Sequence, residues 1–129
     1  MLDTGVVIEL TRGHLPLSAI GNDDVALSAI GLAELLAGIA GDPDADRRAR
    51  SRAVLDNVLE LAPIEDYTAA VAPHHAELLV HARRTGRPRS AHDLIIAATA
   101  RATDRILFTT DSKAGFDELP GVQARLLTP

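Results

Sequence analysis

The sequence predicts an α/β domain in which a parallel sheet lies between layers of helices. Short apolar runs alternate with stretches of helical periodicity, an alternation typical of parallel sheets with helices on both faces. The length of 129 residues suits one compact domain over residues 1–129. Aromatic residues make up only 2% of the chain. Alanine and aliphatic side chains must therefore fill the core, which favours helices packed closely on a small sheet.

Five short apolar segments are the predicted strands, and they cover residues 2–8, 25–27, 63–65, 106–109 and 124–127. The segment 106–109 has the pattern of a fully buried strand. The first strand is unusually short before Asp3, because only two residues precede that acid. Either a few residues are missing at the start or this strand is stunted. In folds of this kind, ligands bind beyond the carboxyl ends of the strands.

Four segments have helical patterns, and they cover residues 29–39, 48–61, 66–84 and 91–103. Apolar side chains in the second segment recur with the i, i+3, i+4, i+7 spacing of an amphipathic helix. Pro73 is expected to kink or interrupt the third segment. The fourth segment is apolar on most sides, so we expect it to lie deep in the core.

The balance of charge argues against a protein that coats nucleic acid through a basic surface. The chain has 13 basic and 18 acidic residues, with a formal charge of −5. A nuclease is compatible with this balance, because bound metal ions offset carboxylates locally. Arginines cluster within residues 47–52 and 83–89. A solvated helix face is the plain alternative to a phosphate-binding role for both clusters.

The absence of cysteine excludes disulfides, zinc–thiolate sites and thiol catalysis. The first residues lack the basic and apolar regions of a signal peptide, and the apolar runs are too short to cross a bilayer. Stacking of bases on aromatic platforms is nearly excluded by the low aromatic content. We therefore expect a soluble, cytoplasmic protein with no membrane partner.

Two acidic residues, Asp3 and Asp111, follow predicted strands, at the end where α/β folds place their chemistry. Thr109 and Thr110 add hydroxyl groups beside Asp111. Each acid also has a simpler interpretation. Asp3 is a suitable N-cap for a following helix, and Asp111 suits an Asx-turn after its strand.

Glu34 and Asp93 belong to the two most apolar helical segments. Glu34 is the only charged residue within 29–39, and a carboxylate buried without a partner is costly unless a cation lies nearby. A solvent-facing position is the alternative. Asp93 follows Ser90 by three residues, which is the pattern of a capping box and complements the helix dipole. Capping and metal binding are compatible, because the two carboxylate oxygens can serve different partners.

Asp3, Glu34, Asp93 and Asp111 together form the acidic quartet on which the functional prediction rests. Each signal is weak alone, but four acids at strand ends and on apolar helices predict one divalent-metal site. Carboxylate oxygens suit Mg²⁺ or Mn²⁺ better than Zn²⁺. Such a site is useful where negative charge builds up on phosphate oxygens.

The sequence resembles the PIN-domain ribonucleases, specifically the VapC toxins of VapBC toxin–antitoxin modules. The most specific matching blocks are Asp-x-x-Ile-Ala-Ala-x-Ala at 93–100 and Thr-x-Asp at 109–111. Other matches are Leu2-Asp3-Thr4, Ser28 with 32–35, Gly86-Arg87-Pro88, Phe116 and Pro120-Gly121-Val122. The likeness covers essentially the whole chain, in order and at family-like spacing.

The resemblance implies a PIN-like parallel sheet of about five strands and a quartet that binds Mg²⁺ or Mn²⁺. It implies endoribonuclease activity on structured RNA such as tRNA or rRNA, a cognate VapB-like antitoxin that blocks the site, and a homodimer. Thr4 and Thr109 are implied as supporting hydroxyls. Gly5 departs from the family, which often has Asn there. Lys113 replaces a further acid found in some members, which leaves Asp117 as a doubtful extra acid.

Arg87 and Arg89 precede the helix of Asp93 and are the predicted contacts for RNA phosphates. His92 is expected to point away from the quartet. The alternative function is a catalytically silent PIN-like module kept for partner binding, although no acid of the quartet is missing. A phospho-acceptor receiver domain is disfavoured, because that class needs paired acids after the first strand and Asp3 stands alone.

Overall fold

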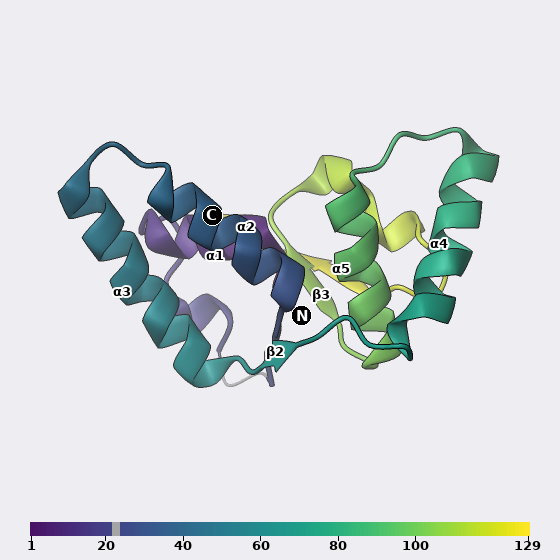
Figure 1. Cartoon of the computed structure of the whole chain (residues 1–129), viewed down its shortest axis with the longest axis horizontal. Coiled ribbons are helices and arrows are strands. Elements are labelled where there is room, and N and C mark those ends of the chain that lie inside the picture. The colour runs from purple at the N-terminus through teal and green to yellow at the C-terminus, as the bar shows by residue number, and fades with distance from the viewer. Residues whose placement is uncertain (22–23) are drawn as a thin grey trace.

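The computed structural model describes residues 1–21 and 24–129, and Figure 1 shows helices on both sides of a small central sheet. The α-helices are α1 (Thr4–Thr11), α2 (Ala29–Ala40), α3 (Ala45–Leu61), α4 (Val71–Thr85) and α5 (Ala91–Ala102). The strands are β1 (Leu27–Ser28), β2 (Ile64–Glu65), β3 (Leu107–Thr109) and β4 (Ala124–Leu126). Short 3-10 helices are η1 (Leu17–Ala19), η2 (Ser112–Ala114) and η3 (Phe116–Glu118).

The sheet consists of two parallel strand pairs, β1 with β2 and β3 with β4. Leu2 forms parallel bridges to Leu27 in β1 and to Phe108 in β3, so it lies between the two pairs. The backbone N–H of Leu2 donates to Ala26 O at 2.8 Å, and that of Asp3 donates to Phe108 O at 2.9 Å. The predicted α/β class with parallel strands is confirmed. The fifth strand is reduced to this one bridging residue.

The predicted strand over residues 2–8 is wrong beyond Leu2, because helix α1 begins at Thr4. The buried side chains of α1 are Val6, Val7 and Leu10, and this spacing places all three on one side of a helical turn. An extended chain would have turned Val6 and Val7 to opposite faces of the sheet. The helical arrangement buries both in the same core.

Helix α4 begins at Val71, five residues later than predicted. Pro73 therefore falls in the first turn, where a backbone N–H has no partner within the helix to lose. The predicted interruption thus takes the form of a helix start, and residues 66–70 precede the helix. The other three helical predictions agree with α2, α3 and α5 to within a few residues.

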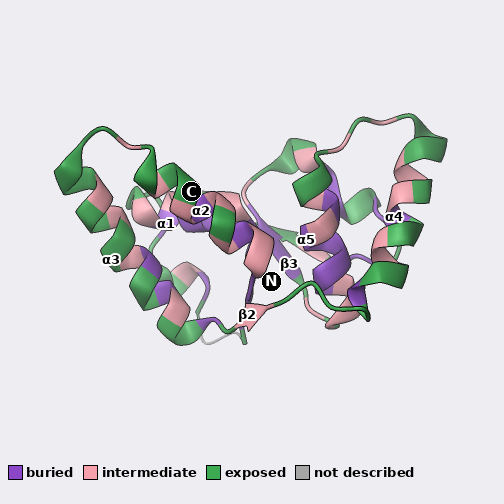
Figure 2. Cartoon of the chain, viewed as in Figure 1, coloured by how far each residue is buried: buried purple, intermediate pink, exposed green. Residues whose placement is uncertain are grey.

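Two hydrophobic clusters form the interior, and Figure 2 shows buried residues in β3 and α5 and exposed residues on the outer sides of α3 and α4. The first cluster packs α1, α2 and α3 around Leu2 and Phe108. The second packs α4, α5 and β3 around Met1. The segment 1–3 therefore lies on the boundary between the clusters, and Asp3 lies at its end. Within the described residues, no helix is long and apolar enough to cross a membrane.

Candidate active site

The four acids of the quartet come from four separate segments that meet at this boundary. Asp3 directly precedes α1, Glu34 lies in the second turn of α2, Asp93 lies in the first turn of α5, and Asp111 follows β3. The pKa of Asp93 is raised from 3.8 to about 6, first by burial and then by the negative charges of Asp3, Glu34 and Asp111. The quartet is therefore electrostatically coupled, as charges gathered at one place must be.

Asp3 is the most enclosed member of the quartet, with only 7% of its surface exposed. Thr109 Oγ1 donates a hydrogen bond to Asp3 Oδ2 at 2.9 Å. Burial raises the pKa of Asp3, the Thr109 hydrogen bond opposes this rise, and the charges of Asp111 and Glu34 add to it. Asp3 occupies the N-cap position of α1, yet its side chain makes no capping hydrogen bond. Its carboxylate is directed instead toward the other three acids of the quartet.

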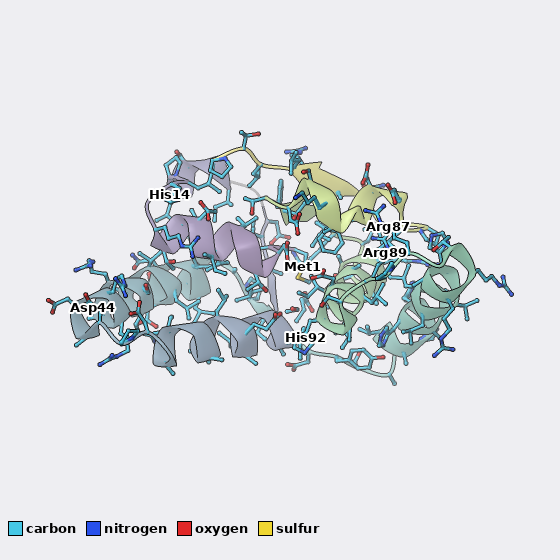
Figure 3. All side chains as sticks on the ribbon, turned by 90° about the horizontal axis from the view of Figure 1, so that it is seen from above. Met1, His14, Asp44, Arg87, Arg89 and His92 are labelled. Atoms are coloured by element: carbon cyan, nitrogen blue, oxygen red, sulfur yellow. The ribbon has the colours of Figure 1, made fainter. Side chains whose placement is uncertain are left out.

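Glu34 is held at the rim of the site by two side chains. Thr4 Oγ1 donates to Glu34 Oε1 at 3.3 Å, and His92 Nδ1 lies 3.3 Å from Glu34 Oε2. Figure 3 shows His92 where the start of α5 approaches α2. The prediction that His92 points away from the quartet is therefore wrong. Its position depends on how α5 crosses α2, which the sequence does not reveal.

Ser90 and Asp111 make the local contacts that the sequence suggested for the starts of α5 and of the turn after β3. The backbone N–H of Asp93 donates to Ser90 Oγ at 3.4 Å, so Ser90 caps α5. Asp111 Oδ1 accepts from the backbone N–H of Lys113 at 2.8 Å, as an Asx-turn requires. The N–H of Asp111 itself donates to Thr109 Oγ1 at 3.0 Å. One hydroxyl, that of Thr109, thus joins Asp3 to Asp111.

Gly5, in the first turn of α1, lies beside the segment that follows β3. A Cβ atom at this position would lie 2.8 Å from Thr110 Oγ1 and 3.9 Å from Asp3 Oδ2. The Thr110 hydroxyl therefore occupies space that any larger residue at position 5 would need. Gly5 has no side chain of its own, and the hydroxyl of Thr110, from the segment after β3, lies in that space.

A model of the PIN domain family matches residues 1–122 of the chain. Ribonuclease VapC5 of Mycobacterium tuberculosis is 34% identical over 113 residues, which are 86% of this chain and 82% of that protein. The chain belongs to the VapC toxin family of PIN-domain nucleases. The tRNA(fMet)-specific endonuclease VapC of Shigella flexneri is 28% identical over 128 residues, covering 95% and 93%.

Solved structures of VapBC proteins have the same fold as this chain. The crystal structure of VapBC2 from Rickettsia felis, bound to a DNA fragment from its promoter, matches with a TM-score of 0.84 and 25% identity. The match covers 98% of this chain and 97% of that one. The family assignment therefore rests on both sequence and structure.

The carboxylates of this PIN domain are the right donors for a hard divalent cation. Among residues 1–21 and 24–129, however, no three Asp, Glu or His side chains stand close enough to hold one ion together. Ligation by three of them requires side-chain rotation, which the one-third exposed side chain of Glu34 allows. The mutual repulsion that raises the pKa of Asp93 is the charge that a cation would offset. The residues present therefore fit Mg²⁺ or Mn²⁺.

Asp117 lies outside the coupled group. It is exposed in η3 and lines a separate cavity of about 270 Å³ together with Asp111 and Thr109. Its charge is not among the largest causes that raise the pKa of Asp93 or Asp3. The role of an extra acid, already doubtful from the sequence, gains no support from this position.

Arg87 and Arg89 bind groups of the protein itself. Arg87 Nη2 donates to Lys113 O at 2.8 Å, and Arg89 Nη1 donates to Ala114 O at 2.5 Å. Both guanidinium groups also pair with Glu118. The side chain of Arg89 is only 5% exposed. This arrangement does not favour the predicted contact with RNA phosphates.

Proposed function

We propose that this protein is a divalent-metal-dependent endoribonuclease that acts as the toxin of a type II toxin–antitoxin module. The proposed substrate is structured RNA, such as tRNA or rRNA, and the proposed ion is Mg²⁺ or Mn²⁺. The observation that carries the proposal is the electrostatic coupling of Asp3, Glu34 and Asp111 to Asp93. Four carboxylates gathered at a strand-end boundary of a PIN domain are suited to bind a cation that activates water.

The quartet would hold the ion, with Asp3 held by Thr109. Glu34, which contacts Thr4 and His92 in this structure, would rotate to join it. A bound divalent ion supplies a water of lowered pKa and offsets charge on the phosphate oxygens. An oxygen of Asp93 or of Glu34 would accept the proton of the attacking water. The Thr109 hydroxyl donates to one oxygen of Asp3, which would leave the other oxygen available as a ligand.

The proposed partner is a VapB-like antitoxin. The Rickettsia felis relative was crystallised as a VapBC complex. In this chain a groove of about 650 Å³ runs between α1, α2 and α3, with an apolar floor that includes Val7, Leu35 and Leu55. Glu34 lines the same groove, so a segment seated there would reach the quartet. The family resemblance also favours a location in the cytoplasm. It favours a homodimer as well, and light scattering of the purified protein tests that state.

The decisive experiment is cleavage of total RNA in Mg²⁺ or Mn²⁺ by the wild-type protein and by Asp93→Asn. Asp56→Asn is the matched control, because Asp56 lies on α3 in an exposed ion pair with Arg52. We expect Asp93→Asn to lose at least about 100-fold in rate and Asp56→Asn to match the wild type. Equal activity in all three proteins would contradict the role of Asp93 in catalysis, and no activity in any of them would favour a silent binding module.

A further inference from the structure

Arg87 and Arg89 form a clamp between the link that precedes α5 and the segment that follows Asp111. Arg89 Nη1 donates to Ala114 O at 2.5 Å and to Gly115 O at 3.0 Å, while Arg87 Nη2 donates to Lys113 O at 2.8 Å. Arg89 Nη2 adds a contact to Glu118 at 3.3 Å. Residues 25 to 31 positions apart in the sequence are joined in this way. Figure 3 shows both arginines directed at this C-terminal segment.

Gly115 lets the guanidinium of Arg87 approach the backbone closely. A Cβ at Gly115 would lie 2.8 Å from both Nη1 and Nη2 of Arg87, and the residue has a φ of +60°. Both facts favour glycine, the first through contact and the second through conformation. Glu118 completes the clamp. Its pKa is held below the ordinary value, mainly by Arg87 and to a smaller extent by Arg89.

The clamp connects the two segments that carry Asp93 and Asp111. On one side, the link with Arg87 and Arg89 leads directly to Ser90, which caps α5 ahead of Asp93. On the other side, the carbonyls that accept the arginine bonds end the 3-10 helix η2, and Asp111 is the N-cap of that helix. Displacing either segment would move its acid relative to the other.

We propose that Arg87 and Arg89 are positioning residues that set the separation of Asp93 and Asp111 for metal binding. This inference rests on the proposed function, and it replaces the predicted phosphate contacts. Guanidinium groups suit the role because their planar fork can bind carbonyls and a carboxylate together, which an ammonium group cannot match. Groups that orient metal ligands in this way typically change metal affinity by about 10–100-fold when replaced.

Arg101, on the helix that carries Asp93, offers a matched control. It pairs with Glu77, donates to Pro120 O at 3.2 Å, and packs on Gly121, where a Cβ would lie 2.9 Å from Arg101 Nε. Arg101 therefore makes the same kinds of contact as Arg87. It does so in the last turn of α5, at the opposite end from Asp93.

The test measures Mn²⁺ affinity by electron paramagnetic resonance, together with kcat, KM and the salt dependence of RNA cleavage. The variants are Arg87→Ala, Arg87→Lys, Gly115→Ala and Arg101→Ala in the full chain. We expect the first three to weaken Mn²⁺ binding roughly 10-fold and to lower kcat more than they raise KM. Excess Mn²⁺ should recover part of the lost activity. Arg101→Ala should change Mn²⁺ affinity by less than about twofold.

Gly115→Ala separates the clamp from a phosphate contact, because it leaves every charge in place. If Arg87→Ala flattens the salt dependence with Mn²⁺ affinity unchanged, while Arg87→Lys and Gly115→Ala behave as wild type, the clamp is wrong and RNA contact is favoured. Equal loss in Arg101→Ala would also overturn the clamp. A wild-type protein that neither binds Mn²⁺ nor cleaves RNA overturns the proposed function and the clamp together. An active wild type with unaffected clamp variants overturns the clamp alone.

Discussion

The N-terminal acids Asp3 and Glu34 and the C-terminal acids Asp93 and Asp111 are held by different means. The N-terminal pair belongs to the cluster of α1, α2 and α3, and hydroxyl groups of Thr109 and Thr4 contact its carboxylates directly. The C-terminal pair lies at the starts of α5 and η2, where backbone capping fixes each residue. The arginine clamp then fixes the two starts relative to each other.

This difference shows which carboxylate is placed by burial in the core and which is placed by hydrogen bonds. Asp3 follows Leu2, which is fully buried, so packing of the first cluster places that carboxylate. Asp111 is exposed and follows β3 into irregular backbone, so only hydrogen bonds can define where it points. Thr109 belongs to both arrangements, because its hydroxyl contacts Asp3 and also accepts from the N–H of Asp111.

Replacing Thr109 with valine should therefore have the largest effect on stability. The shape is kept, but the buried carboxylate of Asp3 and the N–H of Asp111 both lose their partner. We expect the free energy of unfolding to fall by about 3 kcal/mol, measured by urea denaturation. Thr109→Ser should recover most of it.

Thr99→Val is the matched control for this change. Thr99 is also buried, but its hydroxyl donates only to Ile95 O within the same helix. Its replacement should cost about 1 kcal/mol or less. Equal losses at the two positions would mean that Thr109 is an ordinary core residue and that the acid pairs are not joined through it.

Asp93→Asn should raise stability at neutral pH in the presence of a chelator. The pKa of Asp93 in the folded protein is about 6 against 3.8 ordinarily, so folding takes up a proton between these values and stability falls as pH rises through that window. At pH 7 the ionised carboxylate is unfavourable. After discounting for its partial exposure, we expect Asn to gain about 1 kcal/mol at pH 7 and nothing near pH 4.

Thermal unfolding of the Asp93→Asn and Asp56→Asn variants in a pH series checks this expectation. Asp56 lies on an exposed helix face, so its replacement should change stability by less than about 0.5 kcal/mol at any pH. A loss of stability in Asp93→Asn at pH 7 would instead mean that the helix-dipole contribution of Asp93 outweighs its repulsion from the other acids.

Gly5→Ala should have the smallest effect on stability, and this effect should depend on one residue, Thr110. Alanine normally stabilises a helix relative to glycine by up to about 1 kcal/mol, but here the Cβ would meet Thr110 Oγ1. We expect a loss of about 0.5 kcal/mol in Gly5→Ala alone and a gain in the double variant with Thr110→Ala. Additive effects in this double-mutant cycle would contradict the close approach of the two segments.

Much of the fold was predictable because its signals are local. Helices α2, α3 and α5 follow from periodicity, and β3 follows from its apolar run. The acids were singled out because Glu34 is alone in an apolar helix and because Asp111 follows a strand. Whether they ligate a metal stays a prediction.

The remaining features depend on contacts between distant segments, which single-sequence patterns do not contain. The arginine clusters illustrate the limit. Arg47 pairs with Asp42 five residues away on an exposed surface, as a solvated helix face predicts. Arg87 lies in a similar sequence context, yet its partners are residues 113 and 118. The contact of His92 with Glu34 likewise depends on the crossing of α5 over α2.

The single bridging residue Leu2 has a consequence for the order in which the protein can assemble. Asp3 and the hydroxyl that holds it are 106 residues apart in the sequence, and the neighbours of Leu2 are β1 and β3. During synthesis Asp3 is made long before β3, so its place in the sheet is completed only after β3 has been made. Contacts of such long sequence separation form late in folding. A growing chain therefore cannot acquire the complete site until β3 and Asp111 have left the ribosome.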